Sequence, residues 1–184
     1  MRDLDSLQRL ARGDQAAFES IFRTHYAALV QIAESLLHER AIAEETVQEV
    51  MLELWRRRTS LAIETSLRAY LFRSTRNRAL NYLRHETVIE RTAPFLITET
   101  QAPATAEQDL ADREIDAAVR DAVAGLPQRC REVFVLSRQQ GLRYSEIAEI
   151  LGISVKTVEA QMGKALRILR ERLAAWLPSA QEPR

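Results

Sequence analysis

The 184-residue sequence lacks the residues on which disulfide frameworks, metal sites and nucleotide-binding loops depend. Its single cysteine, Cys130, excludes an internal disulfide, and together with three scattered histidines it provides no zinc-like cluster. Five glycines occur, and none of them forms a phosphate-cradling G-x-G-x-x-G loop. We therefore expect no cofactor, no structural metal and no enzymatic activity.

Long apolar runs are also missing from the sequence. No stretch approaches the roughly 20 apolar residues of a membrane-spanning helix. Asp3 and Asp5 stand where a secretory leader would carry positive charge. We therefore expect a cytoplasmic protein that does not insert into a membrane.

The formal net charge is zero, but the charges are segregated along the chain. Residues 65–85 contain five arginines and no acidic residue, whereas residues 86–121 contain 9 acidic and 3 basic residues. Residues 153–172 are basic again, with five basic and two acidic side chains. Because nucleic-acid binding depends on local charge, two basic segments in a neutral chain are compatible with it.

Nearly every periodic stretch predicts helix, so the expected fold class is all-α. In the first half, apolar residues recur at three- and four-residue spacing over about 14–38, 40–58 and 66–86. Asp14 is a candidate N-cap for the first of these helices, and Thr65 or Ser66 for the third. Residues 91–111 combine two prolines with several threonines and show no apolar period, which predicts a linker. The chain thus divides into two small helical domains, 1–90 and 112–177, joined by a flexible linker.

Residues 144–176 have the pattern of a helix-turn-helix. A short helix to Leu151 is followed by a tight turn at Gly152, and Ser154 can cap a long second helix. The apolar side of that second helix consists of Val158, Met162, Ala165, Leu166 and Leu169. Its outward side, which could enter a DNA major groove, contains Lys156, Thr157, Ala160, Gln161 and Lys164. The alternative is a helical hairpin with a solvated basic face.

The helix expected over 66–86 has a second polar face. At 100° per residue, one side gathers Arg73, Arg76, Asn77, Asn81 and Arg84. The opposite side gathers Leu71, Phe72, Thr75, Ala79 and Leu83. Arginine can neutralise phosphates and asparagine can bond base edges, so this face is a candidate nucleic-acid surface. On this evidence alone, a solvated arginine-rich face is an equal alternative.

An acidic row lies on the outward side of the helix expected over 40–58: Glu45, Gln48, Glu49 and Glu53. Such a row is usually a solvated surface, although it could also dock a basic partner. No second cluster of polar or metal-binding groups accompanies it, so we do not expect acid–base catalysis.

Three blocks in order resemble bacterial RNA polymerase sigma factors, specifically the extracytoplasmic-function group (group 4) of the sigma-70 family. They are residues 45–55 (ETVQEVMLELW), residues 67–72 (LRAYLF) with 77–84 (NRALNYLR), and residues 126–173. The resemblance covers roughly residues 5–90, as region 2, and 112–175, as region 4.

The resemblance implies a transcription initiation factor with no catalytic role. Glu45, Gln48 and Glu49 would bind the β′ clamp coiled coil of core RNA polymerase, which also includes β. Arg73, Arg76, Asn77, Asn81 and Arg84 would hold the −10 promoter element as it melts. Lys156, Thr157, Ala160, Gln161 and Lys164 would read the −35 element as duplex DNA. An anti-sigma factor would be a further partner.

The sequence departs from the family pattern at two positions. Asn81 stands where many relatives carry aspartate, and Arg143 stands where a capping serine or threonine is frequent. The main alternative function is a LuxR-type helix-turn-helix regulator, although residues 1–90 lack the strand–helix pattern of a receiver domain. An all-helical adaptor without DNA affinity is a second alternative.

Overall fold

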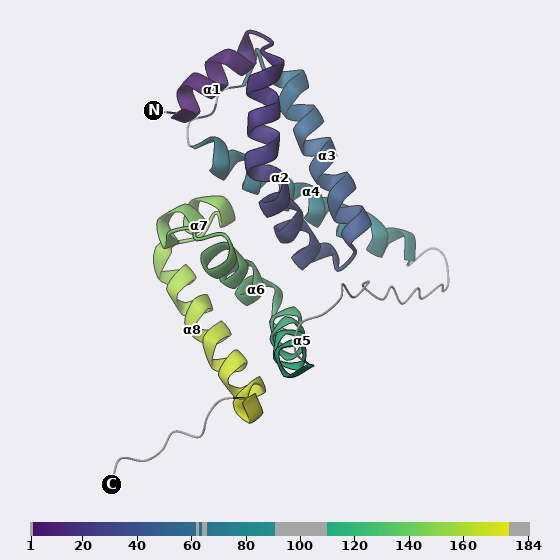
Figure 1. Ribbon diagram of the computed structural model, residues 1–184, viewed down its shortest axis with the longest axis vertical. Coiled ribbons are helices and arrows are strands. Elements are labelled where there is room, and N and C mark those ends of the chain that lie inside the picture. The colour runs from purple at the N-terminus through teal and green to yellow at the C-terminus, as the bar shows by residue number, and fades with distance from the viewer. Residues whose placement is uncertain (1, 62, 64–65, 91–109, 177–184) are drawn as a thin grey trace.

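The computed structural model describes residues 2–61, 63, 66–90 and 110–176, and all regular structure in these ranges is helical (Figure 1). This confirms the expected all-α class. The first half contains α1 (Arg2–Ala11), α2 (Gln15–Leu37), α3 (Arg40–Arg57) and α4 (Leu67–Glu90). The second half contains α5 (Leu110–Ala124), α6 (Gln128–Phe134), the π-helical turn η1 (Val135–Gln139), α7 (Tyr144–Leu151), α8 (Val155–Arg172) and the 3-10 turn η2 (Ala174–Trp176).

Side-chain caps begin the helices where the sequence placed them. Asp14 accepts hydrogen bonds from the backbone N–H groups of Ala16 and Ala17, at 2.9 and 3.2 Å. Hydrogen bonds from Arg9 and then from the Ala17 amide hold the pKa of Asp14 below its usual value. Ser66 caps α4 by accepting from the Ala69 N–H at 3.1 Å; the other candidate, Thr65, lies outside the described residues.

Each half has an apolar interior built from the predicted helix stripes. In the first half, Leu29, Leu54 and Phe72 are fully buried between α2, α3 and α4. In the second half, the α8 stripe is buried at Val158, Met162, Ala165 and Leu169. Leu166, which we expected to point inward, is 36% exposed. At about 100° per residue it falls about 40° beyond Met162, outside the arc that holds the four buried residues.

The two halves pack on one another through α2 and α4 on one side and α6, η1 and α7 on the other. Figure 1 shows the α6–α8 unit beside the lower part of the α2–α4 bundle. Most of the predicted linker, residues 91–109, lies outside the described residues, and its last two residues already belong to α5. The domain boundaries 1–90 and 112–177 remain a prediction.

Thr75 gives the first testable expectation. Its side chain is fully buried in α4, and its hydroxyl has no hydrogen-bond partner in the part of the chain that the structure describes. Because burial of an unpaired hydroxyl is unfavourable, Thr75→Val should stabilise the fold by about 1 kcal/mol. Urea unfolding would measure this change. Thr75→Ser, which keeps the hydroxyl and loses a methyl group, should destabilise the fold, and a loss of stability in Thr75→Val would contradict the reasoning.

Candidate nucleic-acid and partner interfaces

The outward face of α8 is assembled by the turn that precedes it. Gly152 adopts a positive φ of 65°, which glycine accommodates without a Cβ clash, and Ser154 then accepts a hydrogen bond from the Thr157 N–H at 3.1 Å. Lys156, Thr157, Ala160 and Lys164 are all exposed on this face. The first turns of α8 therefore present short polar and basic side chains to solvent.

Gln161, the fifth residue predicted for this face, is half-buried. Its Oε1 lies 3.1 Å from the Sγ of Cys130 on α6. Burial raises the pKa of the Cys130 thiol, with a smaller opposing effect from Lys164. The thiol therefore stays protonated and donates to Gln161, which ties the amide oxygen to the interior.

On α4, four of the five predicted nucleic-acid residues are exposed, and three of these four lie together. They are Asn77, Asn81 and Arg84, and Arg84 Nη1 donates to Asn81 Oδ1 at 3.0 Å. These residues line a groove between α4 and α6 with a volume of about 370 Å³, which Arg129 borders from the opposite side. The groove combines side-chain amides, which are able to bond base edges, with guanidinium groups, which are able to bond phosphates.

The other two predicted α4 residues are bound to the second half of the chain. Arg76 is only 7% exposed, and its Nε lies 3.0 Å from Oε2 of the fully buried Glu132. Arg73 donates to the backbone carbonyl of Glu149 at 2.5 Å. In this conformation the five residues do not form one open surface.

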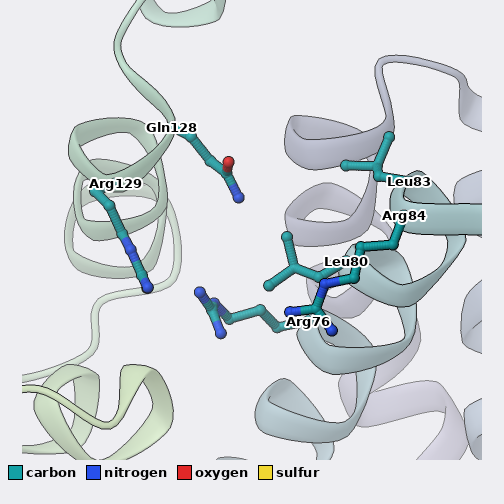
Figure 2. A pocket seen from close by; sticks show the side chains of 6 residues that line it. All are labelled: Arg76, Leu80, Leu83, Arg84, Gln128 and Arg129. Carbon is teal, nitrogen blue, oxygen red and sulfur yellow. The ribbon is translucent and has the colours of Figure 1, made fainter. Parts of the chain in front are cut away.

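Glu132 and Arg129 were not among the residues predicted from the sequence. The available signal was an acidic residue at an apolar position, because Glu132 precedes Leu136 by four residues on the buried side of this helical stretch. Figure 2 shows the result: Arg76 from α4 and Arg129 from α6 point toward one another across the groove. Both lie close to the same Glu132 oxygen, Arg129 Nη1 at 3.6 Å.

The acidic face of α3 is accessible as predicted. Glu45, Gln48 and Glu49 are exposed, and Glu49 forms an ion pair with Arg78 of α4. Glu53 is half-buried and pairs with Arg57 within α3. The structure adds an apolar neighbour that the sequence analysis missed.

This neighbour is a hollow of about 410 Å³ between α2 and α3, lined by Phe18, Leu52 and Trp55 together with Gln15 and Glu19. Leu52 is 45% exposed although it is a large apolar side chain. It lies one turn after Gln48 on the same face of the helix. The α3 surface therefore offers a partner both negative charge and apolar contact area.

His38 gives a pH-dependent expectation. It ends α2 in the left-handed region, and its Nε2 lies 2.8 Å from Nη1 of Arg131 on α6. Burial lowers the pKa of His38, and the positive charge of Arg131 lowers it further. The unfolded chain therefore takes up the proton at a higher pH than the folded chain. The stability from this contact is complete above the usual pKa of 6.5 and is lost as the pH falls below it.

The expected result is a larger decrease in the thermal unfolding midpoint between about pH 7.5 and pH 5.5 for the wild type than for His38→Gln. Glutamine can still accept from Arg131 but does not titrate. Equal decreases in the two proteins would contradict the role of His38.

Two kinds of feature are missing from the described ranges. No helix there is long and apolar enough to cross a membrane. In the same residues, no three His, Cys, Asp or Glu side chains gather as a group that could hold a metal ion.

An all-helical chain with a helix-turn-helix, and with an amide- and arginine-bearing helix beside it, has the features of a DNA-binding transcription protein. Comparison with protein families agrees with this class and specifies it. Residues 21–88 match Sigma-70 region 2, and residues 116–169 match Sigma-70, region 4. The chain belongs to the sigma-70 family, in its extracytoplasmic-function group, and is a sigma factor that directs transcription initiation by RNA polymerase.

Similar proteins span nearly the whole chain. The probable RNA polymerase sigma factor RfaY of Xanthomonas campestris is 29% identical over 172 residues, which cover 91% of this chain and 43% of the relative. This chain thus spans less than half the length of that relative. The RNA polymerase sigma factor CarQ of Myxococcus xanthus is 28% identical over 167 residues, covering 91% and 95% of the two chains.

A solved structure supports the same assignment. It contains the sigma factor RpoE in complex with the anti-sigma factor NepR from Bartonella quintana. The structural match has a TM-score of 0.71 at 25% identity and covers 85% of this chain and 96% of that chain.

Proposed function

We propose that this sigma factor contacts core RNA polymerase and both promoter elements through three separate helices. In this proposal α3 binds the polymerase, α4 binds the −10 element and α8 binds the −35 element. The observation that carries the proposal is the exposure of three chemically different faces on the two sigma-70 regions. The α3 face carries acidic and apolar side chains, and the α4 face combines amides with arginine. The α8 face carries short polar side chains and basic ones.

In this proposal Glu45, Gln48 and Glu49 make the polymerase contact, with Leu52 beside them. We propose that these residues bind the β′ clamp coiled coil of the core enzyme, which also includes β. Complementary charge would steer the encounter, and the apolar hollow would supply buried area.

The DNA contacts divide by type. On α8, Lys156 and Lys164 neutralise phosphates, while Thr157, Ala160 and Gln161 face the base edges of the −35 duplex. On α4, Asn77 and Asn81 read exposed bases of the −10 element. Arg73, Arg76 and Arg84 hold the phosphates of the same element.

The proposal also covers regulation and location. Because the RpoE match was solved with an anti-sigma factor, we propose that this protein too has an anti-sigma partner. The proposed activity consists of binding and positioning alone, without a catalytic step, and takes place in the cytoplasm. The alternative LuxR-type regulator is not favoured, because residues 21–88 match Sigma-70 region 2.

Transcription in a purified system tests the function. The protein and core polymerase should together transcribe a promoter selected from a library that is randomised over both elements, whereas core polymerase alone should not. Absence of transcription from every template in such a library would overturn the proposal.

The −35 assignment has its own test. Lys156→Ala combined with Lys164→Ala should weaken binding of the holoenzyme to −35 duplex DNA about tenfold or more. The variant should also reduce the slope of log affinity against log salt by about 1.8, because two phosphate contacts are lost. Lys-to-Ala changes that left the slope unchanged would contradict phosphate binding by these residues.

A further inference from the structure

Another cleft between the two halves of the chain takes no part in the proposed function. It has a volume of about 380 Å³ and lies between α2 on one side and α5, α6 and η1 on the other, with α6 beside the lower end of α2 (Figure 1). None of the residues proposed to contact polymerase or DNA lines this cleft. Its volume falls in the range of roughly 300–1,000 Å³ that is typical of small-molecule sites.

Two uncommon backbone conformations border the cleft. His38 ends α2 with a φ of 59°, and it is the only non-glycine residue with a positive φ among those that the structure describes. The π-helical turn η1 follows directly after α6 and contributes Val135 and Gln139 to the lining. Both conformations are less favourable than a regular α-helix, and both occur frequently at functional sites. Their convergence marks this cleft as a candidate site.

Two guanidinium groups in the cleft have no carboxylate partner. Arg131 of α6 is half-buried, and burial lowers its pKa more than the neighbouring Glu132 raises it. Arg131 Nη1 contacts His38, but burial and the charge of Arg131 lower the pKa of His38, so the ring is neutral at pH 7 and does not balance a cation. Arg120 of α5 is exposed at the rim. Within the described ranges, neither arginine forms an ion pair.

The cleft as a whole is therefore positively charged. Glu34 of α2 supplies the single carboxylate of the described lining, and this carboxylate lies 3.7 Å from Nη1 of Arg40. The other polar side chains of the lining, those of Gln31, Ser35 and Gln139, are uncharged. Two cations and one shared carboxylate favour an anion with a single charge over one with two.

Apolar side chains line the rest of the cleft. Val123 and Val135 are buried, whereas Val119 is 39% exposed although it is an apolar side chain. Val119 and Val123 lie one turn apart on the side of α5 that also carries Arg120. A ligand with an apolar body would cover Val119, and a carboxylate on the same ligand would match the fork of a guanidinium group.

We propose that this cleft binds a small organic monocarboxylate with a compact apolar body. The carboxylate bonds the guanidinium groups of Arg120 and Arg131, and the body packs on Val119, Val123 and Val135. A phosphate monoester is a poorer ligand, because it carries more than one negative charge and would face the Glu34 carboxylate. The proposal is independent of the polymerase and promoter contacts, because it uses none of their residues.

The first experiment tests the class of ligand on the full-length chain by isothermal titration calorimetry. The probes are benzoate, octanoate and 2-naphthoate, each beside its carboxamide. At least one carboxylate should bind about tenfold or more tightly than its amide, which keeps the apolar body and loses the charge. Acetate, which keeps the charge and lacks the body, should bind about tenfold or more weakly than that carboxylate, and 2-naphthyl phosphate should bind more weakly than 2-naphthoate. The preferred carboxylate should also raise the thermal unfolding midpoint, since it binds the folded state.

Substitutions then test the location. Arg120→Gln should lower the affinity for the preferred carboxylate about tenfold and leave the affinity for its amide unchanged. Arg138→Gln removes the same charge from an exposed position on η1 outside the lining and should bind as the wild type. Val119→Glu places a carboxylate in the cleft and should abolish binding. Its control, Ile115→Glu, changes a residue that is 41% exposed one turn earlier on α5 and should not affect binding.

Two results would overturn the proposal. In the first, none of the three carboxylates binds more tightly than its amide. In the second, a carboxylate binds, but Arg120→Gln and Val119→Glu bind it as tightly as the wild type, which places its site elsewhere on the chain. Because these variants and probes do not involve the proposed polymerase and DNA contacts, either result leaves the proposed function unchanged.

Discussion

Replacing both Glu45 and Glu49 by arginine is expected to abolish binding to core RNA polymerase. The two carboxylates are exposed on neighbouring turns of α3, and reversal of both charges places cations against a surface that attracts anions. Such like-charge juxtaposition costs several kcal/mol, so the affinity should fall about hundredfold or more. Co-elution with sigma-free core polymerase on a sizing column would measure the loss.

The matched control for this experiment is Glu114→Arg with Asp116→Arg. These residues are exposed on α5, outside the proposed polymerase surface, and the double change alters the net charge equally. The control should still co-elute with core polymerase. Loss of the exposed Glu49–Arg78 ion pair contributes little to stability, so unfolding is not an expected cause of the effect. If the Glu45→Arg, Glu49→Arg variant co-eluted with core polymerase to the same extent as the wild type, α3 would not be the surface that binds the polymerase.

Replacing both Asn77 and Asn81 by alanine is expected to abolish discrimination between −10 sequences. Their amides are exposed at the mouth of the α4 groove, and Arg84 fixes the oxygen of Asn81. A side chain that bonds a base edge typically contributes about 1–3 kcal/mol of discrimination, so loss of two such contacts amounts to about hundredfold. Transcription from a selected promoter and from the same promoter with a scrambled −10 element gives the ratio.

The Lys156→Ala, Lys164→Ala protein is the control for this ratio. Because its two substitutions affect the proposed −35 contact, this variant should lower transcription from both templates by the same factor. The ratio between the selected and the scrambled −10 template should therefore stay unchanged. A full wild-type ratio in the Asn77, Asn81 variant would show that other residues read the −10 element.

Much of the fold could be predicted from the sequence because its signals are local. Apolar spacing located the helices, and Asp14, Ser66 and Ser154 marked three of the helix starts through hydrogen bonds to residues two or three positions along the chain. The π-helical turn at Val135–Gln139 was missed. Its apolar pattern does not differ enough from that of an α-helix to be recognised.

The contact between the two halves could not be predicted in the same way. Arg76 and Glu132 are 56 residues apart, and each is unremarkable within its own helix. The helical wheel placed Arg76 with Asn77 and Arg84, but residues 100° apart on α4 meet different surroundings once α6 packs against one flank. The choice between a solvent-facing and a buried arginine depended on a partner far away in the sequence.

The hydrogen bond between Cys130 and Gln161 would limit which bases α8 can recognise if this helix binds the −35 element as proposed. A glutamine that recognises adenine uses both ends of its amide, accepting from N6 and donating to N7. Here the oxygen accepts from the thiol beneath the helix, which holds it on the interior side, so contacts to DNA would fall mainly to the Nε2 hydrogens. These hydrogens can donate to adenine N7, to guanine O6 and N7 or to thymine O4, whereas cytosine presents only a donor in the major groove. Cys130, which lies beneath the helix, would in this way disfavour cytosine opposite Gln161 in the promoter sequence.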